Sequence, residues 1–188
     1  MHRHFIIHKP VGFVSQFVNN KTRKKRLLSE LFDFPEGTMA IGRLDVKSEG
    51  LLLLTTDGKL SHTICSQKVD KEYYVQVDGA ISDTALEALQ NGVSISVKGV
   101  QYITRPSKAF KLEKKPDFDP PTFKIRDDRH GPTTWITITI NEGKYRQVRK
   151  MTAAVGFPTL RLVRVRIGNI ALSDLKNGTV IETPCLNY

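Results

Sequence analysis

GRLDVKSEGLLLLTTDG, residues 42–58, is the stretch around which the rest of the chain can be organised. Its apolar run from Leu51 to Thr55 predicts a strand that is buried on both faces, and the Asp-Gly pair at 57–58 predicts a turn after it. Ahead of this strand, Asp45 stands between the cations Arg43 and Lys47. A carboxylate held in a loop beside fixed cations stays charged and oriented, as a nucleophile or a base must be. Asp45 is therefore a candidate catalytic residue, although a turn or capping aspartate in a basic loop fits this stretch alone equally well.

The remaining elements predict an α+β fold with a mixed, mainly antiparallel sheet and flanking helices. Tyr73 to Asp78 alternates as a strand, with Tyr73 and Val75 on one face and Tyr74 on the other. Short strands outnumber helices, and no regular βαβ alternation occurs. We expect strands at 5–8, 51–55, 73–78, 93–97, 134–141 and 160–167, and helices at 27–32, 82–92 and 145–155. Residues 113–133, rich in proline and charge, predict a surface excursion, and residues 1–188 predict one module, or two subdomains that share one sheet.

The positive charge of the chain is concentrated in two places. The net charge is +10 and the isoelectric point is about 9.7. Residues 21–26 hold five cations and residues 144–168 hold seven, and neither segment contains an acid. These twelve cations exceed the whole net excess, which is typical of a phosphate-binding surface. No strongly amphipathic surface helix accompanies them, so a nucleic acid is favoured over a membrane as the partner.

The cysteines and histidines of the sequence indicate neither a disulfide scaffold nor a metal site. The two cysteines lie far apart without CxxC spacing. The five histidines and the pair Asp127-Asp128 would serve a metal-dependent nuclease, but none has the spacing of ligands on one helix face. The N-terminus has no apolar signal-peptide core and no apolar run reaches transmembrane length. We therefore expect a soluble, cytoplasmic protein without a metal site, and nothing in the sequence demands more than a monomer.

Four motifs in chain order carry a resemblance to a known family. They are HKPVGFVSQ at 8–16, GRLD at 42–45, KEYYVQVDG at 71–79 and GKYRQVRKMTAAVGFPTLRLVRVRIG at 143–168. Together they resemble the pseudouridine synthases of the small-subunit/large-subunit ribosomal RNA family, over residues 4 to 182. The similarity is strongest to the branch that acts on large-subunit RNA and has no S4-type RNA-binding domain in front; here too the first motif leaves no room for one.

The resemblance implies roles for five residues of the site. Asp45 matches the catalytic aspartate, and Tyr73 matches the active-site tyrosine, with Tyr74 as the alternative one position away. Arg149 matches the cation that pairs with the aspartate, and Leu162 matches an apolar residue of the pocket. Arg43, beside the aspartate, is expected to clamp a phosphate or to act as a wedge next to the target nucleotide.

Helix geometry supports the role of Arg149 in part. Val148, Met151 and Val155 recur at the spacing of a buried stripe. Arg149 follows Val148 by about 100° around the helix, so it lies at the edge of that stripe. From there an arginine can enter a pocket and keep a carboxylate charged where water is excluded. The other cations are expected to contact the RNA backbone: Lys21, Arg23, Lys24, Lys25, Arg26, Arg146, Lys150, Arg161, Arg164 and Arg166.

The implied reaction is the conversion of uridine to pseudouridine in large-subunit ribosomal RNA. It breaks the N1–C1′ bond, turns the detached base and joins C5 to C1′, so it needs no redox step, no external group and no cofactor. The sequence leaves open whether Asp45 attacks covalently or deprotonates the sugar. It also leaves a rival, a non-catalytic RNA-binding or ribosome-assembly module. That rival explains the charge but not why GRLD, the tyrosine strand and RQVR occur together.

Overall fold

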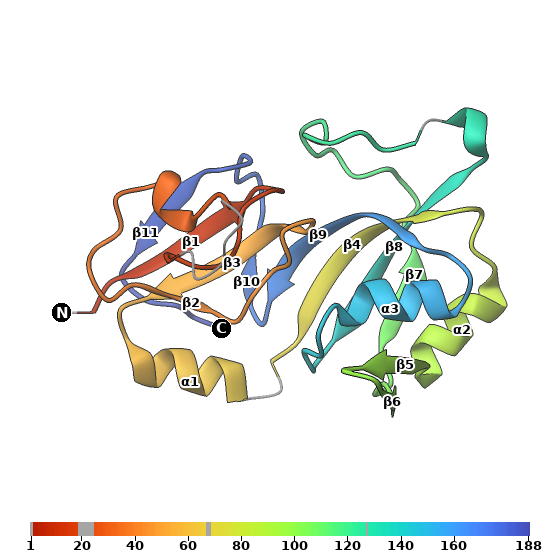
Figure 1. The fold of residues 1–188 in the computed structure, drawn as a ribbon, viewed down its shortest axis with the longest axis horizontal. Helices are drawn as coiled ribbons and strands as arrows, with labels where there is room; N and C mark the ends of the chain where they lie inside the picture. The colour runs from red at the N-terminus through yellow and green to blue at the C-terminus, as the bar shows by residue number, and fades with distance from the viewer. Residues whose placement is uncertain (1, 19–24, 67–68, 127) are drawn as a thin grey trace. The chain divides into compact units, whose positions relative to one another are not determined.

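The computed structural model describes residues 2–18, 25–66, 69–126 and 128–188 (Figure 1). The chain divides into two compact units, which we call unit 1 and unit 2. Unit 1 comprises residues 1–69 and 163–188, and unit 2 comprises residues 70–162. The cations Lys21, Arg23 and Lys24 lie outside the described residues. Unit 1 is thus built from two separate pieces of chain, while unit 2 is continuous.

Unit 1 is built on a sheet in which the buried strand predicted from the leucine run is central. That strand, β3, covers Glu49–Thr55, and all seven of its residues are buried. It pairs antiparallel with β1 (His4–Lys9) and β2 (Met39–Ile41), and parallel with β9 (Thr159–Ile167) at Gly50 and Arg164. The unit is completed by a 3₁₀ turn at Leu28–Glu30, helix α1 at Gly58–Ser66, β10 at Ile170–Ala171 and β11 at Val180–Thr183. Because β11 pairs with β1, the two ends of the chain meet in this sheet.

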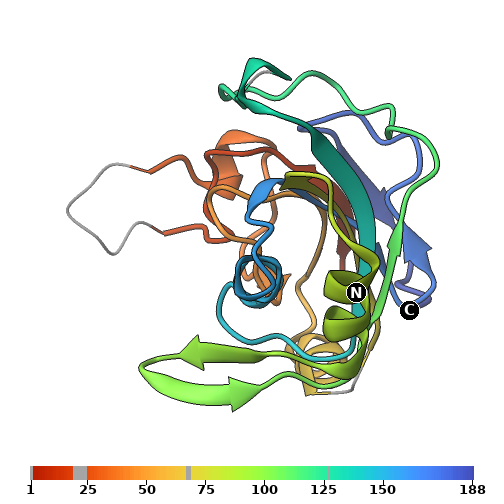
Figure 2. The same cartoon turned by 90° about the vertical axis from the view of Figure 1, so that its right-hand side faces the viewer.

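Unit 2 is a second run of mainly antiparallel strands. Its order is the first half of β9, then β4 (Lys71–Asp78), β8 (Thr133–Ile140) and β7 (Lys108–Lys111). Helices α2 (Asp83–Asn91) and α3 (Gln147–Ala154) lie on one side of these strands (Figure 2). A hairpin of β5 (Ser94–Val97) and β6 (Val100–Ile103) forms a separate two-stranded sheet, and a 3₁₀ turn covers Asp128–His130. The predicted α+β class with a mixed, mainly antiparallel sheet is confirmed.

The segment predicted as a surface excursion packs against part of one face of the unit 2 sheet. It contains no strand among its described residues between β7 and β8. The ring of Phe118 lies 6.1 Å from the rings of both Tyr74 and Trp135. This packing explains why Trp135, on the face of β8 opposite the isoleucines, is also buried. The helices therefore pack on one face of the sheet and Phe118 of the excursion on part of the other, where Phe110 of β7 stays 55% exposed.

Candidate active site

Asp45 lies in unit 1, in the loop between β2 and β3. The loop begins at Gly42 with a φ of 70°, and a turn hydrogen bond from the Ser48 N–H to the Asp45 carbonyl, 3.0 Å long, closes its far side. Arg43 and Lys47 are exposed, whereas Asp45 is half-buried and Leu44 is buried. The two cations that flank Asp45 in the sequence therefore point toward solvent, where a phosphate could reach them.

The charges beneath Asp45 come from strands instead. Lys9, at the end of β1, is fully buried, and its Nζ donates hydrogen bonds to the carbonyls of Pro10 at 2.7 Å and Phe13 at 2.9 Å. Burial lowers the pKa of Lys9 to about 7; Glu49 and Asp45 oppose this shift, and Arg164 adds to it. Unit 1 thus holds a cluster of two acids and two cations around the loop. Sequence reasoning missed Lys9, although its place in HKP at the end of a strand was a signal.

Arg164 belongs to the same cluster, which corrects one expectation. It is 3% exposed, and its Nε donates a 2.7 Å hydrogen bond to the carbonyl of Leu51. Arg161 is 7% exposed, and its Nη2 donates to the Asp119 carbonyl at 2.8 Å. The expectation that both arginines face an RNA backbone is wrong, because each guanidinium is directed into its own unit to satisfy a backbone carbonyl.

The rest of the expected RNA-binding set is more accessible. Arg26 is exposed and Lys25 is half-buried. Arg146, Lys150 and Arg166 are half-buried; Lys150 donates to the Ser96 carbonyl, and Arg166 to that of Gly168. Arg26 also stacks over the ring of Phe13 at 4.0 Å. A phosphate-contacting role for these five residues stays a prediction.

Tyr73, Arg149 and Leu162 all belong to unit 2. Tyr73 is 8% exposed and shares its face of β4 with Val75 and Val77, as predicted, whereas Tyr74 lies on the opposite face against Phe118. Leu162 is buried on β9, the strand next to β4. Asp45 and Arg43, by contrast, belong to unit 1.

Arg149 is carried by α3, whose start differs from the prediction. The helix begins at Gln147 rather than Tyr145, because Arg146 takes a left-handed conformation with φ 53° and ψ 36°. Arg149 is half-buried, and its Nη1 lies 3.4 Å from the Thr159 carbonyl oxygen on β9. Val148 and Met151 are buried as predicted, so Arg149 does lie at the edge of the apolar stripe.

A carboxylate fixes the turn that precedes α3. Glu142 accepts hydrogen bonds from the Tyr102 hydroxyl at 2.5 Å, the Arg105 N–H at 3.0 Å and Gln147 Nε2 at 2.5 Å. Burial raises the pKa of Glu142, but these three donors outweigh it and hold the pKa below its usual value. This network, which spans residues far apart in sequence, explains why the helix starts late.

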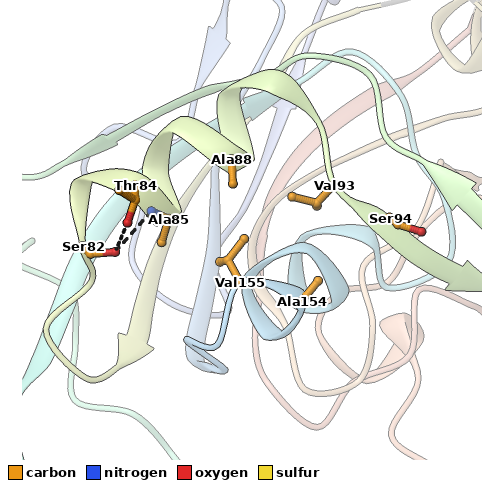
Figure 3. Close-up of a pocket in the computed structure, with 8 residues that line it drawn as sticks. All are labelled: Ser82, Thr84, Ala85, Ala88, Val93, Ser94, Ala154 and Val155. Carbon is orange, nitrogen blue, oxygen red and sulfur yellow. Dashed lines mark hydrogen bonds between the residues drawn. The ribbon is translucent and has the colours of Figure 1, made fainter.

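A pocket in unit 2 is lined by none of the predicted site residues. It measures about 490 Å³ and lies between α2 and α3 (Figure 3). Its lining is small and uncharged: Ser82, Thr84, Ala85, Ala88, Val93, Ser94, Ala154 and Val155. Ser82 caps α2 there by accepting a hydrogen bond from the Ala85 N–H. The pocket offers no acid, base or cation, so it does not compete with Asp45 as a centre of chemistry.

The part of the chain that the structure describes has neither a cluster of metal-ligating side chains nor a membrane-spanning helix. Within those residues, no group of three or more His, Cys, Asp or Glu side chains is arranged to hold a metal ion. None of the described helices has the length and apolar character needed to cross a bilayer.

Comparison with known proteins places the chain in a family. Residues 3–154 match the family model described as RNA pseudouridylate synthase. The chain is 44% identical to "Ribosomal large subunit pseudouridine synthase E" of Xanthomonas campestris pv. campestris, over 92% of this chain and 91% of that protein. It is 42% identical to the protein of the same name in Vibrio parahaemolyticus, over 92% of this chain and 70% of that one.

Solved structures agree with the sequence matches. A protein described as "Crystal structure of pseudouridylate synthase" superposes with a TM-score of 0.76 at 29% identity, and covers 97% of this chain and 70% of its own. "Human RNA Pseudouridylate Synthase Domain Containing 1" superposes with a TM-score of 0.56 at 13% identity, over 96% of this chain and 78% of its own, and shares the fold. On the family model and on relatives that match along most of their length, this chain belongs to the RNA pseudouridylate synthase family.

Proposed function

We propose that this enzyme converts a uridine of large-subunit ribosomal RNA to pseudouridine, and that Asp45 is the carboxylate that performs the reaction. The single observation that carries the proposal is the placement of Asp45, half-buried in the GRLD loop and within electrostatic range of the buried Lys9. The substrate class comes from the relatives, whose names specify the large ribosomal subunit. Family membership disfavours the rival non-catalytic RNA-binding module.

The reaction is an isomerisation in which every atom of the uridine is retained except the C5 hydrogen, which solvent replaces at N1. Asp45 acts on the sugar carbon C1′ or on the proton of its neighbour C2′, and the N1–C1′ bond breaks. The detached uracil turns, and C5 bonds to C1′ as the Asp45–C1′ bond breaks or, in the other route, as the proton returns to C2′. The C5 proton then leaves to a base, for which Tyr73 or a water molecule is the candidate. The target uridine leaves its stack to enter the site, as in other enzymes that act on bases.

The remaining residues bind and orient the RNA in this proposal. Arg149 pairs with Asp45 and Leu162 packs in the pocket, as the motif resemblance implies. Arg43 and Arg26, both exposed in unit 1, contact phosphates without reading sequence. Such contacts act through charge, so binding is expected to weaken as salt is raised.

Tritium release tests the proposal directly. Ribosomal RNA labelled at C5 of uridine loses tritium only if the new carbon–carbon bond forms. We expect wild-type protein to release it without added metal or cofactor, from naked RNA or from pre-ribosomal particles, and Asp45→Asn to release none while still binding RNA. Asp33→Asn, at an exposed carboxylate of unit 1, is the matched control and should be as active as wild type. Intact RNA binding with no release by wild type would instead support the binding module.

A further inference from the structure

The loop that carries Asp45 is held on both sides by the segment that follows β1. The Ser15 hydroxyl accepts a 2.9 Å hydrogen bond from the Leu44 N–H and donates a 3.0 Å hydrogen bond to the Leu44 carbonyl. The Gly12 N–H donates a 2.7 Å hydrogen bond to the Val46 carbonyl. The residues immediately before and after Asp45 are therefore each tied to the same segment.

Ser15 supplies these two hydrogen bonds because, among the described residues, the loop has no neighbouring strand that could supply them. Residues 42–48 lie between β2 and β3 and belong to neither ladder. Ser15 and Leu44 are 7% and 6% exposed, so the Leu44 backbone groups are shielded from water and need partners inside the protein. A hydroxyl both donates and accepts, so one small side chain satisfies both groups.

The clamping segment is itself fixed from two sides. The Lys9 ammonium group bonds the carbonyls of Pro10 and Phe13 and so sets the turn that leads to Ser15. On the other side, the Val14 N–H donates a 3.0 Å hydrogen bond to the Arg26 carbonyl. The segment that holds the Asp45 loop is thus fixed both to the buried end of β1 and to Arg26, the last residue of the basic run.

From this geometry we propose that Ser15 is a positioning residue that sets the place of the Asp45 carboxylate. The inference rests on the proposed catalytic role of Asp45 and extends it to a residue that does not touch the substrate. Ser15→Ala would leave the Leu44 N–H and carbonyl without a partner, so the loop would shift toward other donors or water. Because a displacement of about 1 Å at a reacting group costs about 100-fold in rate, the chemical step should slow by about 10- to 100-fold while RNA affinity is kept.

The test is single-turnover tritium release at saturating enzyme, with RNA affinity and thermal stability measured on the same samples. Ser15→Ala should release tritium about 10- to 100-fold more slowly, and Ser15→Thr, which keeps the hydroxyl, should recover most of the rate. Ser107→Ala is the matched control, because the Ser107 hydroxyl donates a 2.7 Å hydrogen bond to the Leu89 carbonyl in unit 2. It should lose some stability and keep the wild-type rate.

Other outcomes separate this inference from the proposed function. If Ser15→Ala is too unstable to assay, Ser15→Cys replaces it, since a thiol is a weaker donor and acceptor of similar size; it should fall between alanine and wild type. A wild-type rate in the folded Ser15 variants, or an equal loss in Ser107→Ala, would overturn the positioning role while leaving the reaction intact. Absence of release by wild type from both substrates would contradict the proposed function, and this inference with it.

Discussion

Lys9 is a buried amine among charges, and its protonation is coupled to folding. Because its pKa is about 7 in the folded protein, against 10.5 ordinarily, the unfolded chain binds an extra proton between these two values. The energetic penalty of a charged, buried Lys9 is fully present below about pH 7 and disappears as the pH rises toward 10.5. Its two carbonyl partners keep the amine bonded in either protonation state.

We therefore predict that Lys9→Met changes how stability depends on pH. The free energy of unfolding of wild type minus that of Lys9→Met should rise between about pH 7 and 10.5, and should be flat below pH 7. Urea unfolding at a series of pH values measures it. Lys59→Met, at an exposed lysine of α1, is the control and should run parallel to wild type. A difference that stays constant across the window would show that Lys9 titrates normally.

The residues of the site were predictable only where sequence neighbours are also spatial neighbours. GRLD made Asp45 the candidate, but the flanking cations on which that argument first relied are exposed. The buried cations Lys9 and Arg164 come from β1 and β9, and only the fold brings Lys9 within electrostatic range of both Arg164 and Asp45. Ser15 gave no signal of its own, because a serine near a turn has many ordinary explanations.

At the scale of elements, β3 shows how a strand can be predicted while its surroundings are not. Its leucine run was correctly predicted as buried on both faces. Helix α1 was missed, because Asp57-Gly58 was interpreted as a turn; Asp57 Oδ1 in fact accepts hydrogen bonds from the N–H groups of Lys59 and Leu60 and caps the helix. Only Ile64 of α1 is buried, so its apolar periodicity was too weak to reveal it. The short strands β7, β10 and β11 were also missed, because their apolar periodicity is too weak to reveal them.

The close approach of the paired strands β3 and β9 leads to a prediction about Gly50. This residue has a φ of 107°, and a Cβ added there would lie 2.3 Å from the carbonyl oxygen of Arg164 and 2.6 Å from its nitrogen. We expect Gly50→Ala to destabilise unit 1 by more than about 3 kcal/mol, because two backbones must separate. Gly99→Ala, at a φ of 84° with open space around it, should cost only about 1–2 kcal/mol.

Urea unfolding of the two glycine variants beside wild type compares the costs. The backbone strain is similar at both positions. The larger loss of unfolding free energy in Gly50→Ala therefore measures the effect of the close approach of the strands. Equal losses in the two variants would mean that β3 and β9 can move apart without penalty.

At the scale of the whole molecule, the two units differ in how the chain builds them. Unit 2 is one continuous segment, whereas unit 1 needs residues from both ends, since β1 pairs with β11 from His4 with Thr183 to Ile7 with Val180. The sequence supported two subdomains but could not assign residues 163–188 to the N-terminal one. Strand partners that are far apart in sequence leave no local pattern to read.

Removal of residues 180–188 tests this division. We expect the truncated chain to lose amide hydrogen-exchange protection in β1 and β3, because β1 loses its partner strand. Protection in β4 and β8 should be kept, since their pairing from Lys71 with Ile140 to Asp78 with Thr133 lies wholly within unit 2. The two sets of amides are measured in the same sample, so each is the control for the other. Equal loss in both would contradict the division into units.

The discontinuity of unit 1 also sets an order of events during synthesis. A polypeptide leaves the ribosome from its N-terminus, and continuous domains fold first. Residues 70–162 are complete before the segment that carries Arg164, β10 and β11 emerges. The loop of Asp45 is translated early with β1, β2 and β3, yet β9, which carries Arg164 and pairs with β3, arrives late. A nascent chain from which β9 has not yet emerged therefore carries an unfinished site, and its proposed activity on ribosomal RNA must wait until residues 163–188 have joined unit 1.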